Sequence, residues 1–149
     1  MRVTNSAGTS VVVRIIDRCP ECAQNHLDMS EDSFKKLGKL ELGTINIKYD
    51  FVPCPTTGNI KYRIKKDSTK YWVSVLIDNH RIGVKKFEMK GQNTGWVTVT
   101  RASYNEFEYT PSPSIEPPVS FRVTSIDGEV ITDENIISLF PFLFTSLFI

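Results

Sequence analysis

The strongest constraint on the fold is a series of short strand patterns that fills the second half of the chain. The segments are rich in β-branched and aromatic residues and lie at residues 60–65, 71–79, 84–90, 96–102, 104–109, 119–126 and 129–132. Turn residues separate them, including Asp127-Gly128, a strong hairpin signal. No helical period crosses this region. Short strands at this spacing predict a β-sandwich, and about 90 residues are enough for one such core.

The first half of the chain mixes strand and helix signals. Residues 11–16 form a β-branched run that is typical of a strand buried on both faces. Ser30 is a good helix N-cap with acidic residues in the first turn after it. Gly38 is a plausible C-cap, which predicts a short helix between the two.

A strand and a linker follow that helix. Residues 45–51 alternate apolar and polar side chains, which predicts a half-buried strand. Two prolines then stiffen a stretch without apolar periodicity. We therefore divide the chain into residues 1–54, a linker at 55–58, and residues 59–149.

Charge is unevenly distributed along a chain whose formal net charge is only +1. Residues 59–101 hold ten basic and three acidic side chains, a net of +7, whereas residues 102–149 hold one basic and seven acidic, a net of −6. The near-zero total argues against general nucleic-acid binding. A basic block before an acidic one predicts facing strands that pair their charges, with a polyanion-binding face as the alternative.

The three cysteines are Cys19 and Cys22, which form a C-x-x-C, and Cys54. A zinc site would need further ligands at matched spacing, and His26 and His80 do not supply them. A thioredoxin-like redox site would need a helix start beside the motif. The odd number therefore favours the disulfides of a secreted protein, with one cysteine lacking a partner, and no metal or cofactor is expected.

Neither end of the chain predicts a membrane segment or a cleaved leader. The N-terminus lacks the apolar run, about 7–15 residues long, of a secretory signal. Residues 135–149 are uncharged, but they are too short for a spanning helix of about 20 residues, and Pro141 interrupts them. We interpret them as a final strand followed by an irregular end.

Two carboxylates are candidates for chemistry in the first half. Asp17 ends the 11–16 run, and Asp28 lies just before the predicted helix start. Carboxylates at a strand end and a helix start can converge on one groove, and glycosidases use such pairs as acid and base or nucleophile. The alternative is structural, with Asp17 capping a turn and Asp28 supporting the helix dipole.

Aromatic side chains are the candidates for binding in the basic half, namely Tyr71, Trp72, Trp96 and Tyr104. Alternation along residues 71–79 places Trp72 on the face opposite the valines of that segment. An outward Trp on a flat sheet is typical of a surface on which sugar rings stack. The alternative is that both tryptophans belong to the core.

Taken together, residues 9–134 resemble an expansin. His26-Leu27-Asp28-Met29-Ser30 resembles the H-F-D-L-S region of the expansin barrel domain, and Tyr49-Asp50-Phe51-Val52-Pro53-Cys54 is similar to the end of that domain's last strand. The second half matches the expansin carbohydrate-binding domain at four places. These are Tyr62-Arg63-Ile64-Lys65, Tyr71-Trp72, Asn79-His80 and Tyr104-Asn105-Glu106-Phe107.

The resemblance implies a mainly β fold, with a partial six-stranded double-psi β-barrel containing a short helix, followed by an immunoglobulin-like β-sandwich. Expansins loosen polysaccharide contacts in cell walls without cutting chains. Asp28 matches the family's essential acid, and Asp17 matches its neighbouring carboxylate. The family barrel begins well before the strand at residue 11, so the chain resembles an N-terminally truncated expansin.

The resemblance also implies a ligand and a surface that binds it. Tyr71, Trp72 and Tyr104 match the aromatic trio on which glucan stacks, and Lys65 matches a nearby basic contact. We therefore expect an extracellular monomer that binds cellulose or a related β-glucan, without nucleic-acid or membrane partners. Two alternatives are a carbohydrate-binding module with an inactive barrel remnant, and a lytic enzyme of the endoglucanase type.

Overall fold

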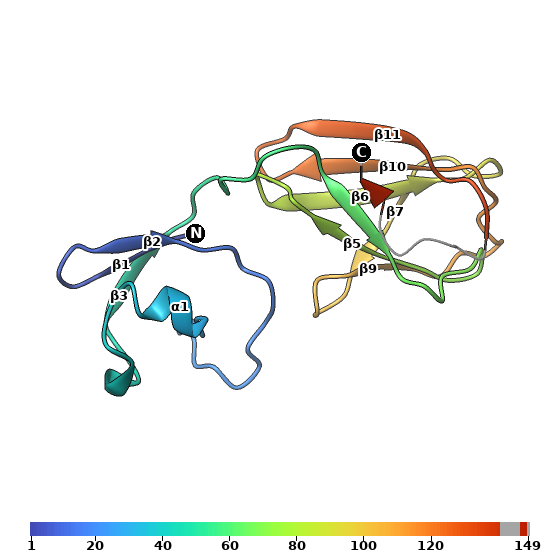
Figure 1. Ribbon diagram of the computed structural model, residues 1–149. Helices are drawn as coiled ribbons and strands as arrows, with labels where there is room; N and C mark the ends of the chain where they lie inside the picture. Colours follow the sequence, from blue (N-terminus) through green and yellow to red (C-terminus); the bar gives the residue numbers. More distant parts are fainter. Residues whose placement is uncertain (141–146, 149) are drawn as a thin grey trace. The chain divides into compact units, whose positions relative to one another are not determined.

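The protein consists of two compact units, Met1–Pro55 and Thr56–Ile149. The computed structural model describes residues 1–140 and the backbone of residues 147–148. Each unit is built mainly from antiparallel strands, and among the described residues helix is confined to short turns of the first unit (Figure 1). The mainly β prediction is therefore confirmed.

The first unit is a small three-stranded sheet with a short helix. Its elements are β1 (Arg2–Asn5), β2 (Ser10–Val12), α1 (Glu31–Phe34), the 3-10 turn η1 (Leu40–Leu42) and β3 (Ile47–Asp50). The sheet order is β2-β1-β3. The strands predicted from the sequence do not include β1, although Asn5 indicates the turn that follows it. The Asn5 side-chain oxygen accepts hydrogen bonds from the backbone N–H groups of Ala7 and Thr9 at 3.0 and 2.8 Å, which closes the β1–β2 turn.

The prediction of a doubly buried strand at residues 11–16 is wrong. The strand β2 ends at Val12, and the side chains of Ile15 and Ile16 are 57% and 75% exposed. The reason is that β2 lies at the edge of its sheet, and the core of this unit has only Met1, Val3 and Leu37 as buried members. An apolar run is buried only where another layer packs on it.

The predicted helix begins at the expected place but is short. The backbone N–H groups of Ser33 and Phe34 both donate to the Ser30 carbonyl oxygen at 2.9 Å. However, the Ser30 hydroxyl donates to the Ser33 hydroxyl oxygen at 3.0 Å instead of capping the helix. The C-cap is Lys35 and not Gly38, so that part of the prediction is wrong.

The second unit is a sandwich of two antiparallel sheets that face each other (Figure 1). The four-stranded sheet has the order β11-β10-β6-β7, and the five-stranded sheet has the order β12-β4-β5-β9-β8. The bounds are β4 (Lys61–Ile64), β5 (Val73–Asp78), β6 (Val84–Lys90), β7 (Val97–Thr98), β8 (Thr100–Arg101), β9 (Phe107–Tyr109), β10 (Val119–Ser125), β11 (Val130–Ile137) and β12 (Leu147–Phe148). Residues 135–137 belong to β11, which agrees with a strand at the start of the 135–149 segment. Of the irregular end predicted after it, residues 147–148 form β12, and residues 141–146 and 149 lie outside the described residues.

Aromatic rings fill the space between the two sheets. Tyr62 and Phe87 each pack edge-on against Phe121, with ring centroids 5.0 and 5.1 Å apart. The Tyr62 hydroxyl donates to a carboxylate oxygen of Asp133 at 2.6 Å, and this bond joins β4 to β11 across the sandwich. Burial raises the pKa of Tyr62 far above its ordinary value, because the phenolate would be poorly solvated there.

The predicted strand at residues 96–102 is two strands. Its first part, β7, pairs with β6 in one sheet, and its second part, β8, pairs with β9 in the other. Between them Val99 is buried, and its N–H donates to the Phe87 carbonyl oxygen at 2.9 Å. The chain therefore crosses from one sheet to the other, which a continuous apolar pattern does not show.

Candidate functional site

An outward face of the five-stranded sheet brings together most of the predicted binding residues. Along β5 the side chains of Val73, Val75 and Ile77 are buried in the core, as alternation predicts. Trp72 lies one residue before β5, in a tight turn in which its N–H donates to the Thr69 carbonyl oxygen at 3.2 Å. The Trp72 side chain is half-buried and is not part of the core, so the core alternative is wrong for this residue.

Lys65 lies beside Trp72 on this face. The Lys65 N–H donates to the Ser74 carbonyl oxygen at 2.9 Å, so the chain after β4 still runs alongside β5 at this point. The Lys65 ammonium lies 5.4 Å from the centroid of the Trp72 ring, a cation–π contact. The same ammonium lies 3.7 Å from a carboxylate oxygen of Glu106.

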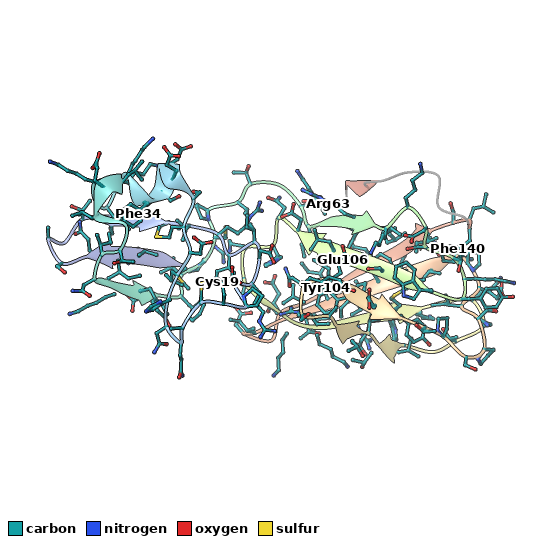
Figure 2. All side chains as sticks on the ribbon, turned by 90° about the horizontal axis from the view of Figure 1, so that it is seen from below. Cys19, Phe34, Arg63, Tyr104, Glu106 and Phe140 are labelled. Carbon is teal, nitrogen blue, oxygen red and sulfur yellow. A yellow bond between two sulfur atoms is a disulfide. The ribbon has the colours of Figure 1, made fainter. Side chains whose placement is uncertain are left out.

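Tyr104 reaches the same face from the turn between β8 and β9 (Figure 2). Its hydroxyl donates to a carboxylate oxygen of Glu108, and this bond raises the pKa of the Tyr104 phenol. Glu108 stands directly opposite Ser74 in the register of β9 and β5. Paired residues point to the same side of a sheet, so Tyr104 is held over the outward face, and its side chain is 51% exposed.

Tyr71 is exposed and makes a cation–π contact of its own. It lies in the turn before β5 and is 61% exposed, with the Lys70 ammonium 5.4 Å from its ring centroid. Lys70 pairs with Glu116 at 3.1 Å, and this hydrogen bond raises the pKa of Lys70. The structure therefore groups Trp72, Tyr104 and Lys65 at the outward face, while Tyr71, in the same turn as Trp72, has the Lys70 ammonium beside its ring. We call the first three residues the aromatic platform.

Two acidic residues beside the aromatic platform were not among the predicted site residues. Glu106 and Glu108 flank the buried Phe107, so strand alternation alone places both carboxylates on the outward side. That alternation is the sequence signal for both carboxylates. Lys65–Glu106 and Lys70–Glu116 also realise the expected pairing between the basic and acidic blocks.

The other tryptophan lies on the opposite sheet. Trp96 is half-buried outside the core, with the Arg122 guanidinium 4.4 Å and the Lys90 ammonium 5.9 Å from its ring centroid. Arg122 also donates two hydrogen bonds to Glu88, at 2.7 and 2.8 Å. These bonds lower the pKa of Glu88 to about 2. Trp96 therefore lies on the sheet opposite the one that carries Trp72, and two cations contact its ring.

The two predicted carboxylates of the first unit line one open depression of about 750 Å³. The walls come from two stretches without regular structure, residues 13–21 and 26–30, together with Met1, Val12 and Ser33. Asp17 and Asp28 are both exposed in it, and Asp17 accepts a hydrogen bond from the Arg18 N–H at 2.7 Å. The depression can therefore offer two carboxylates to the hydroxyl groups of one ligand.

The cysteines agree with the disulfide prediction. Cys19 and Cys22 form a disulfide in the wall of that depression, and Cys54 is a free thiol. The described residues contain no group of three or more acidic, His or Cys side chains that could hold a metal ion. Within the same residues, no helix combines the length and apolar character needed to cross a membrane.

The fold and the site define a class of protein with a partial β-barrel, a β-sandwich and an aromatic platform on one sheet of the sandwich. Residues 1–49 match the family model described as lytic transglycolase, and residues 55–135 match the model of the expansin-like protein middle domain. The second model covers more than half of the chain. The chain therefore belongs to the expansin-like proteins.

Individual relatives support this assignment. Expansin-YoaJ of Bacillus subtilis (strain 168) is 36% identical over 121 residues, which are 81% of this chain and 51% of that protein. Expansin-like protein 5 of Dictyostelium discoideum is 35% identical over 137 residues, covering 87% of this chain and 56% of that protein. The chain thus spans about half the length of these relatives.

A solved structure also matches the fold. A mutant expansin of Clavibacter michiganensis, in complex with cellohexaose, superimposes with a TM-score of 0.78 at 28% sequence identity. The match covers 93% of this chain and 67% of that one. The prediction of a partial double-psi barrel followed by a β-sandwich is therefore confirmed.

Proposed function

We propose that this chain is an extracellular, non-hydrolytic protein that binds cellulose or a related β-glucan and loosens contacts between polysaccharide chains. The observation that carries the proposal is the aromatic platform, where Trp72 and Tyr104 lie at the outward face of one sheet and the Lys65 ammonium lies beside the Trp72 ring. The solved relative with cellohexaose supports a β-glucan as the ligand.

Stacking on the platform supplies the binding free energy. The apolar face of a pyranose ring covers an aromatic ring, while the hydroxyl groups at its edge remain available for hydrogen bonds. Area bookkeeping at about 25 cal/mol per Å², for a ring that hides on the order of 80 Å², gives roughly 2 kcal/mol for each aromatic. A sheet face orders few residues upon binding, so little of this energy is lost to entropy.

The depression of the first unit supplies the second contact with polysaccharide. In this proposal Asp28 contacts or protonates a glucan oxygen, and Asp17 is the neighbouring carboxylate. Each hydrogen bond that these carboxylates accept from a glucan hydroxyl replaces one between glucan chains. Chains can then slide without a covalent bond being cut.

The decisive binding experiment is a cellulose pull-down with Trp72→Ala in the whole chain. We expect binding to fall about 10-fold or more, because roughly 2 kcal/mol of ring burial is lost. Trp96→Ala is the matched control, since Trp96 is equally half-buried but lies on the other sheet, and it should bind like the original chain. Unchanged binding by a folded Trp72→Ala variant would remove the platform from the proposal.

Loosening is tested separately from binding. We expect strips of isolated cell wall under constant load to extend faster with the protein, and Asp28→Asn to abolish this effect while cellulose binding persists. No soluble sugar should appear. Release of cello-oligosaccharides that Asp28→Ala abolishes would instead establish a lytic enzyme of the endoglucanase type.

A second candidate is binding without loosening. It is favoured by the open form of the depression, whose wall includes the exposed Ile15 and Ile16. In that case the wall strips would not extend faster, while Trp72→Ala would still abolish cellulose binding.

A further inference from the structure

Glu106 lies beside the aromatic platform and contacts both the sheet beneath it and Lys65. One of its carboxylate oxygens accepts a hydrogen bond from the Ser74 hydroxyl at 2.6 Å and lies 3.7 Å from the Lys65 ammonium. Ser74 is fully buried, and its own N–H donates to the hydroxyl of the buried Ser68 at 3.2 Å. The Glu106 carboxylate is therefore held to the sheet by Ser74, and it faces the Lys65 ammonium.

The fixed Glu106 carboxylate restricts the positions that the Lys65 ammonium can occupy. A lysine side chain at a surface ordinarily samples many rotamers, and ordering it costs free energy. Here the ammonium is held between the Glu106 carboxylate and the Trp72 ring, whose centroid is 5.4 Å away. A fixed ammonium beside a stacking ring can donate to the hydroxyl groups of a sugar that covers that ring.

The same contact also balances charge on the platform. Glu106 lies opposite the positive charge of Lys65, and nearby Arg63 pairs with Asp78 at 2.6 Å on the same sheet. Glu108 adds a further carboxylate beside Tyr104. A polymer that carries carboxylates would meet these acids at short range, where like charges repel.

We propose that Glu106 is a positioning and specificity residue, which holds Lys65 over Trp72 and makes the platform select uncharged glucan over carboxylated polysaccharide. The inference rests on the proposed function, since it concerns the same platform. It extends that function by explaining how the platform distinguishes uncharged glucan from carboxylated polysaccharide in a cell wall.

The test uses Glu106→Gln in the whole chain with two polymers, crystalline cellulose and carboxymethylcellulose. Glutamine keeps an acceptor for the Ser74 hydroxyl, so the buried hydrogen bond survives and only the charge is lost. We expect binding to cellulose to weaken about threefold, within the range of a surface ion pair. Binding to carboxymethylcellulose should strengthen about threefold or more, and about 0.5 M salt should cancel this gain.

Three further variants separate a positioning role from a general charge effect. Glu129→Gln makes the same charge change in the hairpin between β10 and β11 and should alter neither affinity. In a Lys65→Met background, Glu106→Gln should cause no additional loss on cellulose, because the two residues act as one unit. In a Trp96→Phe background, Glu106→Gln should also shift the emission of Trp72.

The outcomes distinguish this inference from the function on which it rests. Suppose that Trp72→Ala abolishes cellulose binding but Glu106→Gln behaves like Glu129→Gln on both polymers. The proposed role of Glu106 is then wrong, and the aromatic platform is retained as the binding surface. Additive losses from Lys65→Met and Glu106→Gln would overturn it as well. If Trp72→Ala binds normally, the platform itself is wrong.

Discussion

The two units of this protein use similar apolar residues and enclose them very differently. In the sandwich, sixteen buried residues form one continuous core between two sheets. In the first unit, a single described sheet of three strands has a core of three buried residues, and Ile15 and Ile16 remain exposed. The comparison shows that a β-branched run becomes core only where a second layer covers it.

The functional residues follow the same division. The aromatic platform lies at the ends of paired strands, where hydrogen bonds hold the backbone of Trp72 and Lys65 and the hydroxyl of Tyr104. Asp17 and Asp28 stand on segments without regular structure around an open depression. A rigid face suits recognition of a flat ligand. The two acids lie on loop segments, whose backbone is held less firmly by hydrogen bonds than a strand.

The sharpest test of this contrast is a pair of core truncations. Phe87→Ala should lower the free energy of unfolding of the sandwich by about 3–5 kcal/mol, because the ring packs against both Phe107 and Phe121. Leu37→Ala should weaken the first unit and leave the sandwich transition in place. Denaturant unfolding followed by amide signals of each unit measures both. A single transition shifted equally by both variants would contradict the division into two units.

Hydrogen exchange should show the next largest difference. Amides of β5, β6 and β10 should exchange only through global unfolding of the sandwich, since these strands lie inside their sheets. Amides of the first unit should exchange through openings that cost about 2–3 kcal/mol less. Equal protection in both units would show that the small core is as stable as the large one.

Acid should destabilise the sandwich through Glu88. Hydrogen bonds from Arg122 lower the pKa of Glu88 from an ordinary 4.5 to about 2 in the folded state. A lowered folded pKa adds stability above the unfolded value, and this stability is lost as pH falls from 4.5 towards 2. We expect a loss of about 2 kcal/mol in that window, absent in Glu88→Gln. Glu31→Gln, which breaks the exposed pair with Lys35 in the first unit, is the control and should leave the sandwich profile intact.

Reduction of the disulfide should have the smallest effect and should be confined to the first unit. The Cys19–Cys22 bond closes a loop of only four residues, so breaking it should cost the first unit no more than about 2 kcal/mol. Thiol titration of the native chain should find one reactive group, Cys54, and three after reduction. A destabilised sandwich after reduction, or tightly bound zinc at one ion per chain, would be inconsistent with this assignment.

Much of this architecture follows from local sequence pattern alone. Strand alternation correctly predicts the buried Val73, Val75 and Ile77, and Asp127-Gly128 correctly predicts the β10–β11 hairpin. The predicted segment at residues 84–90 matches β6 at both ends. These features depend on side chains near one another in sequence, so a period of two or a turn dipeptide is enough to determine them.

Other features were decided only by packing between distant segments. Exposure of Ile15 and Ile16 depends on whether a layer covers β2, and the split of residues 96–102 depends on which strand each half meets. The contacts of Glu106 with Ser74 and Lys65 join three strand regions that the sequence separates by 32 and 41 residues. A one-dimensional pattern shows which way a side chain points from its own strand, but the partner it meets there is determined by register and sheet order.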